Sequence, residues 1–445
     1  MASHIVTSAD VAPDGERLKS AKVDKIKMIA GGVSLLLSIV SAILLFGPKE
    51  TWTANYAYSW VFALFFFFTL AVGGCFWTLL HNVSNSGWGT SVRRVFENLG
   101  AVYPWMFIFA IPLLIPNVQQ YLYEWMNMHR GLDTHGGEYS VKEALHHSGD
   151  PHDHLLYLKH WYLNIPFWYG RFIFYFIGLS AVILGLRKLS VAQDTDPNPG
   201  TSRLFRARFH STYTLIIFAI TITFAGFDWL KGLDYTWFST MWGVYLFAGS
   251  ALNSMAVIII TVALLQRAGY MKKVVTPEHF HIKGKLLLAF TIFWAYVTFS
   301  QYFLIWYANI TEETKYFLIR NTGGWNIGMM CLVVFHFVVP FVILLQAWLK
   351  RNPKTLSLMA VYTLVMHILD HYLIAIPERS ISLMNMLPDV YGDVETTIPG
   401  AFIGDILAFI TIGSGFVFFY LRSLGQNNLY PNRDPRILES ANVSN

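Results

Sequence analysis

GKLLLAFTIFWAYVTFSQYFLIWYAN, residues 284–309, decides the fold class, because it is long and apolar enough to cross a bilayer. A hydrocarbon core needs about 20 mainly apolar residues in a single helix. Within this stretch, Thr291, Trp294, Thr298 and Gln301 recur at helical spacing and share one face. If this face contacted lipid, the amide of Gln301 would lack hydrogen-bond partners. We therefore expect the polar stripe to face other helices.

Similar apolar stretches recur along most of the chain. Of its 445 residues, 54% are hydrophobic and only 13% are charged, whereas a soluble domain normally carries about 25% charged residues. The sequence therefore predicts an all-α polytopic membrane protein with about ten transmembrane helices. The expected spans are 26–46, 54–80, 97–115, 165–186, 211–230, 236–266, 284–307, 326–349, 355–376 and 398–421.

The distribution of Lys and Arg predicts the orientation of these spans. Basic residues concentrate in the N-terminal tail (1–25), in the loops after the even-numbered spans, and in the C-terminal tail (422–445). Because cytoplasmic loops carry an excess of Lys and Arg, both termini are expected to be cytoplasmic. Residues 1–25 lack a signal-peptide pattern, so the first span is expected to remain a membrane helix. The basic residues indicate anionic lipids, and no nucleic acid, as partners.

The order of the spans suggests an internal repeat. Spans 2–5, within residues 54–230, and spans 6–9, within 236–376, are expected to form two parallel four-helix bundles. The helices 26–46 and 398–421 would be peripheral. A large, histidine-rich outer loop, 116–164, lies within the first bundle. Its histidines could bind a metal, but none has the spacing of a zinc site, and we favour a surface that docks another subunit.

Ionisable groups inside the spans are the most informative residues, because a charge at the bilayer centre costs about 2.5–3.5 kcal/mol. In the ninth span a His, an Asp and a second His stand at positions i, i+3 and i+4 and share a face. If this face meets the histidine of the eighth span, the second bundle holds a polar core and a proton path toward the outer surface. A structural network of polar groups is the alternative. The proton-path candidates are His336, His367, Asp370, His371, Gln301, Thr298 and Asp405.

Three further patterns concern ion pairs and cofactors. Arg171 and Asp228 lie in the outer half of the first bundle and are expected to form a structural ion pair. His336 and His367 could ligate a b-type haem, although bulky residues flank both positions. Cys75 and Cys331 are too few for an iron–sulfur cluster or a c-type haem. We therefore expect this chain to bind no cofactor and no metal of its own.

Four stretches carry a resemblance to a known family. They are GFDWLKGLDYTWFSTMWGVYLFAGS (226–250), GKLLLAFTIFWAYVTFSQYFLIWYANITEET (284–314), HFVVPFVILL (336–345) and DHYLIAIP (370–377). With them the chain resembles the polysulfide-reductase-type (NrfD-like) membrane subunits, and most closely the F subunits of alternative complex III, a bacterial quinol:cytochrome c oxidoreductase.

This resemblance implies a respiratory complex in the bacterial inner membrane. The implied partners are a related ten-helix membrane subunit and, on the periplasmic side, iron–sulfur and multi-haem c-type cytochrome subunits. Quinol, either menaquinol or ubiquinol, would be oxidised at the outer side. The haem c and iron–sulfur clusters of the partner subunits would then carry the electrons.

One departure from the family limits what this chain is expected to do. The family's quinol pocket depends on a His and an Asp in the first bundle of the related subunit. Here spans 2 and 3 have no histidine in their middle, and His81 lies at the inner end of span 2. We therefore expect a subunit without catalytic residues, which scaffolds the redox subunits and contributes a proton path. Two alternatives remain open: a quinol-binding subunit in its own right, and an independent secondary transporter.

Overall fold

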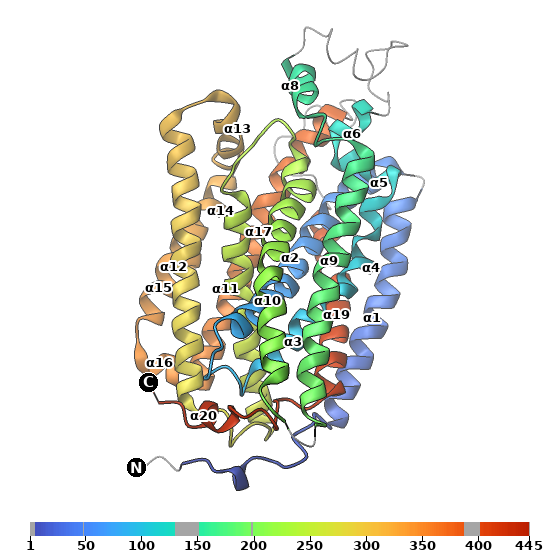
Figure 1. Ribbon diagram of the computed structural model, residues 1–445. Coiled ribbons are helices and arrows are strands. Elements are labelled where there is room, and N and C mark those ends of the chain that lie inside the picture. The colour runs from blue at the N-terminus through green and yellow to red at the C-terminus, as the bar shows by residue number, and fades with distance from the viewer. Residues whose placement is uncertain (1–4, 48, 130–150, 197–198, 387–400, 445) are drawn as a thin grey trace.

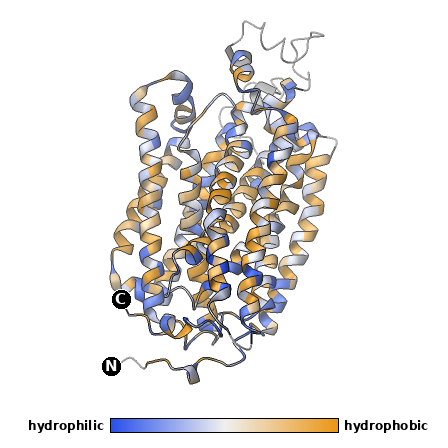
Figure 2. Cartoon of the chain, in the orientation of Figure 1, coloured by the Kyte–Doolittle hydropathy of each residue, from blue (hydrophilic) through white to orange (hydrophobic). Residues whose placement is uncertain are grey.

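The computed structural model describes residues 5–47, 49–129, 151–196, 199–386 and 401–444 (Figure 1). Within these ranges it contains ten helical segments long and apolar enough to cross a membrane, and no β-strand. The prediction of an all-helical chain with about ten such segments is therefore confirmed. The helices run side by side, with mostly apolar residues along their middle and polar residues gathered toward the ends (Figure 2).

Eight of these ten segments in the described ranges are single helices. Two of them extend well beyond the expected bounds: the fifth begins at Ser202 rather than at 211, and the ninth continues to Met386 rather than ending at 376. The eight are α1 (Ala21–Phe46), α2 (Glu50–Val83), α9 (Ile165–Gln193), α10 (Ser202–Trp229), α11 (Trp242–Arg267), α12 (Pro277–Ala308), α17 (Pro353–Met386) and α19 (Ala401–Gln426).

The third segment, expected as a span over 97–115, is found at Arg93–Leu114, but it is not one continuous helix. Pro104 and Pro112 lie inside it; each lacks an N–H donor, and its ring disturbs the preceding turn. The chain therefore passes through a series of short pieces. These are α3 (Arg93–Gly100), the 3₁₀ turn η2 (Tyr103–Trp105), α4 (Met106–Ala110) and the 3₁₀ turn η3 (Ile111–Leu114).

The eighth segment, expected as one helix over 326–349, is also interrupted. A widened π-helical stretch, η5 (Leu332–Val338), lies between α14 (Trp325–Cys331) and α15 (Val339–Leu344), and a separate short helix, α16 (Ala347–Arg351), follows. Pro340 has no N–H to bond the carbonyl four residues earlier, which belongs to His336. The α-helical hydrogen-bond pattern cannot continue there, which accounts for the wider turn.

The ninth segment continues through a proline because another helix replaces the missing hydrogen bond. Pro377 cannot donate to the carbonyl of Leu373. Arg320, at the end of α13 (Thr311–Arg320), donates to that oxygen from Nε over 2.8 Å and to the Ile374 carbonyl from Nη2 over 2.7 Å. Such compensation by a neighbouring helix allows α17 to pass its proline.

α2 is the central helix of the molecule and packs against α3, α10, α11, α17 and α19. In its most apolar 18-residue stretch, 94% of the residues are buried. A Cβ atom at Gly73 would lie 2.2 Å from the Ser250 carbonyl of α11, and one at Gly74 would lie 2.6 Å from the Gly100 backbone nitrogen of α3. The two glycines therefore permit close helix approach. Because α11 and α17 belong to the second expected bundle, the two halves share an interface along α2.

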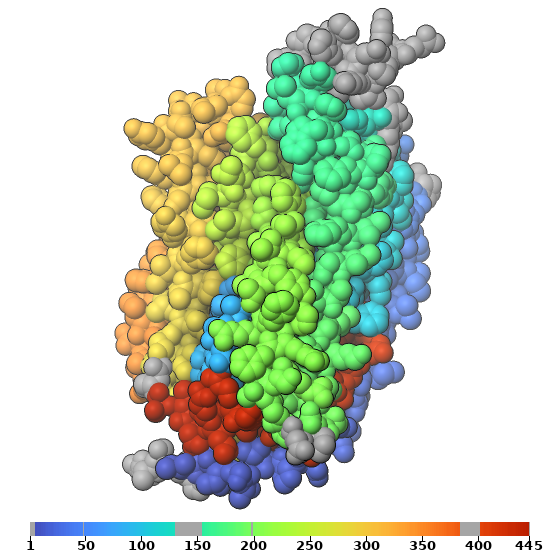
Figure 3. All heavy atoms as spheres, viewed as in Figure 1, coloured from blue at the N-terminus to red at the C-terminus, as the bar shows by residue number. Residues whose placement is uncertain are grey.

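Both ends of the described chain lie at the same end of the bundle (Figure 1), and the terminal segments form a layer across it (Figure 3). The Leu429 N–H donates to the Glu16 carbonyl over 2.7 Å, and Arg93 pairs with Asp434 at 2.7 Å. At the opposite end, the described parts of the outer loop form short helices (Figure 1). These are α5 (Pro116–Leu122), α6 (Glu124–His129) and α8 (Pro151–Lys159).

Candidate functional site

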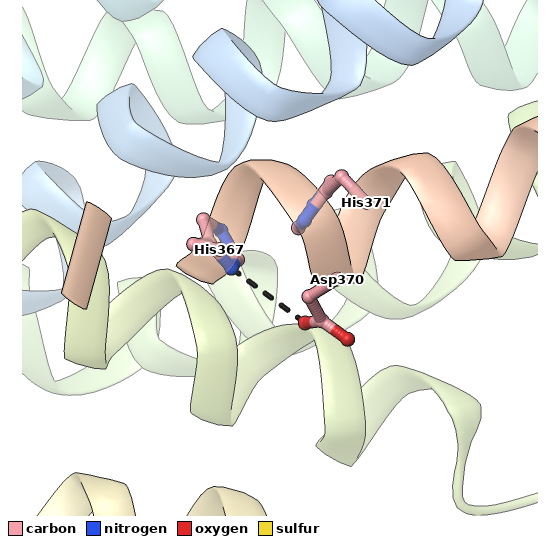
Figure 4. A group of neighbouring side chains, drawn as sticks. All are labelled: His367, Asp370 and His371. Carbon is pink, nitrogen blue, oxygen red and sulfur yellow. Dashed lines mark ion pairs between the residues drawn. The ribbon is translucent and has the colours of Figure 1, made fainter. Parts of the chain in front are cut away.

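Three polar side chains of α17 form the centre of the site (Figure 4). His367, Asp370 and His371 are all buried, and their ring and carboxylate groups lie on one side of the helix. The His367 Nδ1 atom lies 3.6 Å from Asp370 Oδ2, and the centroids of the two imidazole rings are 4.1 Å apart. Because an α-helix rises 1.5 Å per residue, His367 lies about 21 Å along α17, far from either end. These groups therefore occupy the middle of the bundle.

His336 joins this group from the π-helical stretch η5. Its ring centroid lies 6.4 Å from that of His367 and 4.0 Å from that of Trp294 on α12. Both ring nitrogens of His336 are buried, and neither has a hydrogen-bond partner among the described residues. The same holds for both nitrogens of His371 and for Nδ1 of His367. The structure thus brings His336, His367, Asp370 and His371 together; we call these four residues the histidine cluster.

Two aromatic residues hold the carboxylate of Asp370. The Tyr245 hydroxyl, from α11, hydrogen-bonds to Oδ1, and the Trp294 indole N–H donates to Oδ2 over 3.2 Å. Trp294 belongs to the polar stripe predicted from the sequence, whereas Tyr245 was not among the predicted site residues. A single tyrosine near the start of an apolar helix forms no periodic sequence pattern. Its hydrogen bond to Asp370 therefore follows only from the packing of α11 against α17.

The polar stripe of α12 lies against neighbouring helices. Thr291, Trp294 and Gln301 are buried, and Thr298 is half-buried. A cavity of about 40 Å³ lies between these helices, bordered by Thr298, Gln301 and Asp370. A buried water needs about 10–15 Å³ of such space, so the cavity has room for about three. The Gln301 Oε1 atom has no hydrogen-bond partner in the described chain, and a cavity water would satisfy it.

An ion pair borders the cavity on the side away from the termini. Arg320 Nη1 lies 2.8 Å from Glu378 Oε1, and both side chains are buried. The Arg320 guanidinium also stacks on the Tyr316 ring at 3.4 Å. Sequence reasoning missed this pair because Arg320 and Glu378 were placed in loops rather than in helices. The end of α13 and the unbroken passage of α17 through Pro377 bring them inside.

Asp405, a predicted member of the proton path, lies in a different network. Its carboxylate accepts hydrogen bonds from Arg379 at 2.8 Å, from Ser59 at 2.6 Å and from Tyr372 at 2.9 Å. Arg379 compensates its charge, and these three partners of Asp405 lie outside the histidine cluster. This arrangement is that of a structural ion pair between α19, α17 and α2.

Arg171 and Asp228 form an ion pair with two parallel contacts of 2.8 Å. The Asp228 carboxylate also accepts from Tyr175 at 2.6 Å and from Tyr162 at 3.1 Å, and the guanidinium lies over the Tyr162 ring at 3.9 Å. Every donor and acceptor at this site has a partner, which is typical of a structural site.

A b-type haem does not fit between His336 and His367. A cofactor of that size needs roughly 300 Å³ or more, whereas the cavity beside the cluster holds about 40 Å³. The Trp294 ring also packs directly on His336.

A single metal ion is a closer match to the donor types, but the spacing is wide. His367, Asp370 and His371 offer three ligand atoms within 4.8 Å of one another. Zinc bonds of about 2.0–2.2 Å require ligand atoms about 3.4 Å apart. The side chains would have to move, and Asp370 would have to give up its bonds from Tyr245 and Trp294.

The outer-loop histidines fall mostly outside the described part of the chain. His135, His146 and His147 lie there, and the side chain of His152 is likewise not described. His129 and His160 use a ring nitrogen to bond the carbonyls of Leu163 and Tyr157, at 2.8 and 2.7 Å. These two bonds order the loop locally. The prediction of a docking surface there stays a prediction.

Comparison with known proteins leaves the family resemblance as an expectation. No family model matches the chain, and no curated protein matches it in sequence.

Proposed function

We propose that the histidine cluster passes protons, and that the chain is a cofactor-free integral membrane subunit of a respiratory quinol:electron-acceptor oxidoreductase. The observation that carries this proposal is the burial of four titratable side chains in the middle of a bundle of apolar helices. Ionisable groups at membrane depth are expensive, and chains of Asp and His are the usual material of proton relays.

The charge balance of the cluster favours a mobile proton. Asp370 is buried, and His367 is the only basic side chain within ion-pair distance of it in the described ranges. Tyr245 and Trp294 donate to the carboxylate but carry no charge, so His367 is the group with which Asp370 would exchange a proton in this proposal. At 3.6 Å, a small rotation brings Nδ1 of His367 into hydrogen-bond distance of Asp370. The proton can then move between the two groups.

The position of the cavity indicates the direction in which this proton can leave Asp370. It lies on the side of Asp370 away from the termini, with Thr298 and Gln301 on its wall and Arg320 at its outer border. About three waters in this space would connect the carboxylate with the Arg320–Glu378 pair. The resulting path runs from the middle of the bundle toward the face expected to be periplasmic.

The setting within a complex follows from the resemblance described above. In this proposal the chain lies in the inner membrane with both termini in the cytoplasm, and spans 2–5 and 6–9 correspond to two parallel bundles. Its partners are a related ten-helix subunit that oxidises quinol and periplasmic subunits that hold iron–sulfur clusters and haem c. The outer helices α5, α6 and α8 of this chain then support those subunits.

The test is purification of the chain through a tag at its C-terminus, after gentle extraction in detergent. The proposal predicts stoichiometric co-purification of a second membrane subunit and of proteins with the absorption spectrum of c-type haem. Isolation of a lone, colourless and stable protein with transport activity in vesicles would contradict it and favour a secondary transporter. Labelling of this chain by a photoreactive quinone would assign it the quinol site.

A further inference from the structure

A groove opens between the first and last long helices at the end of the molecule that carries both termini. Its volume is about 570 Å³. On one side it is bordered by the segment that leads into α1 and by the first turns of that helix. On the other side it is bordered by the last turns of α19. Its lining includes Lys19, Asp24, Lys27 and Arg422.

The groove carries an excess of positive charge. Lys19, Lys27 and Arg422 line it, and Asp24 is its one acidic residue. The Asp24 carboxylate is already engaged by Lys27, at 2.6 Å. In the described part of the chain, no carboxylate lies within ion-pair distance of Lys19 or Arg422, and both residues are exposed. Two cations are therefore free to bind an anion.

The walls beside the groove are apolar and exposed. Met28 of α1, one helical turn after the groove residue Asp24, is 67% exposed. On the other side, the Arg422 guanidinium lies 5.6 Å from the centre of the Trp105 ring, and that ring stacks on Phe419 at 4.6 Å. A tryptophan at the boundary between apolar and polar residues is typical of the membrane–water interface. The cations therefore lie where lipid headgroups would meet the protein.

These features select one class of ligand. A free inorganic anion would use the two cations but would leave the apolar walls uncovered. A phospholipid joins an anionic phosphate to acyl chains across the same boundary, and basic pockets between helices on the cytoplasmic side suit such headgroups. We propose that this groove binds one anionic phospholipid of the inner leaflet. Its phosphate is held by Lys19 and Arg422, and its acyl chains lie along α1 and beside Trp105.

The test compares lipid binding by the purified, delipidated complex of wild type and two double variants. Phosphatidylglycerol and phosphatidylcholine with identical acyl chains are titrated, and bound lipids are counted by native mass spectrometry. The test variant is K19Q/R422Q. The control variant, K272Q/K354Q, removes two exposed lysines from the same end of the molecule but away from the groove. Both variants change only exposed side chains, so the fold is retained.

Each basic residue near an anionic headgroup raises affinity roughly fivefold, so loss of two predicts about 25-fold weaker binding of phosphatidylglycerol. The control variant should bind as wild type does, and phosphatidylcholine should bind weakly to all three proteins. The inference is overturned if K19Q/R422Q and K272Q/K354Q behave alike, or if phosphatidylcholine binds as tightly as phosphatidylglycerol. Displacement of phosphatidylglycerol by millimolar inorganic phosphate would also overturn it, since the site would then recognise an ion and not a lipid.

Discussion

Replacement of Asp370 by Asn removes the proposed proton carrier while keeping the shape of the site. In the wild-type protein the two carboxylate oxygens accept from Tyr245 and Trp294. An Asn side chain can turn its oxygen toward the indole N–H and its NH₂ toward the tyrosine oxygen. Only the Tyr245 hydroxyl proton then loses its acceptor, which costs about 1–3 kcal/mol. We therefore expect the Asp370→Asn complex to assemble.

Leucine at the same position should behave differently. Asp370→Leu leaves both the Tyr245 hydroxyl and the Trp294 N–H buried without an acceptor. Each unsatisfied donor costs about 1–3 kcal/mol, so the total is about 2–6 kcal/mol. The contrast between the two variants, read as thermal stability of the detergent-solubilised complex, tests the hydrogen-bond geometry independently of proton transfer.

The functional effect of Asp370→Asn should be large. An amide cannot accept a proton at neutral pH, so proton movement through the cluster should slow by about 100-fold or more. The assay uses the complex in liposomes, with quinol added, an electron acceptor outside, and a pH-sensitive dye to count protons per electron. Asp370→Glu, which keeps a carboxylate, should restore part of the rate. If Asp370→Asn moves protons at the wild-type rate and ratio, the relay proposal is wrong.

Three further variants test the surroundings of the site. Arg171→Met should destabilise the protein by about 3–5 kcal/mol, because it leaves Asp228 buried without its cation. The double variant with Asp228→Leu should lose less stability. Unfolding in SDS measures both. Pro340→Ala supplies the N–H that the His336 carbonyl lacks, so η5 should become regular α-helix and turn His336 away from the cluster. The rate of proton transfer should then fall without loss of stability. An unchanged rate would exclude a role for His336. Arg320→Met frees the carbonyl opposite Pro377 and leaves Glu378 unpaired, and it should lower thermal stability by at least about 3 kcal/mol; a change below about 1 kcal/mol would contradict the bridging role.

Part of the candidate site could be predicted from the sequence, because helix geometry is local. Once residues 355–376 are taken as helical, positions 367, 370 and 371 must share a face. The stripe of α12 is predicted in the same way. Ion-pair candidates such as Arg171 and Asp228 stand out because charges in apolar helices need partners.

The remainder depends on contacts between segments far apart in sequence. Tyr245 and Asp370 are 125 residues apart, and their hydrogen bond depends on how α11 and α17 are rotated against each other. Asp405 belongs to the pair with Arg379 because α17 continues past Pro377 and carries Arg379 into the bundle. Hydropathy specifies neither a helix rotation nor the continuation of a helix through proline.

The sequence by itself determined that this chain folds into about ten apolar helices, because their length and composition match a bilayer and each helix satisfies its own backbone hydrogen bonds. It also determined which side chains of one helix lie together. Only the tertiary structure decided which helices meet and where a proline interrupts a helix or is accommodated in it. It therefore also decided which buried polar groups lie together in the histidine cluster and which are fixed in ion pairs. The physical reason is that such partnerships arise from packing between helices, where a small rotation changes every neighbour of a side chain.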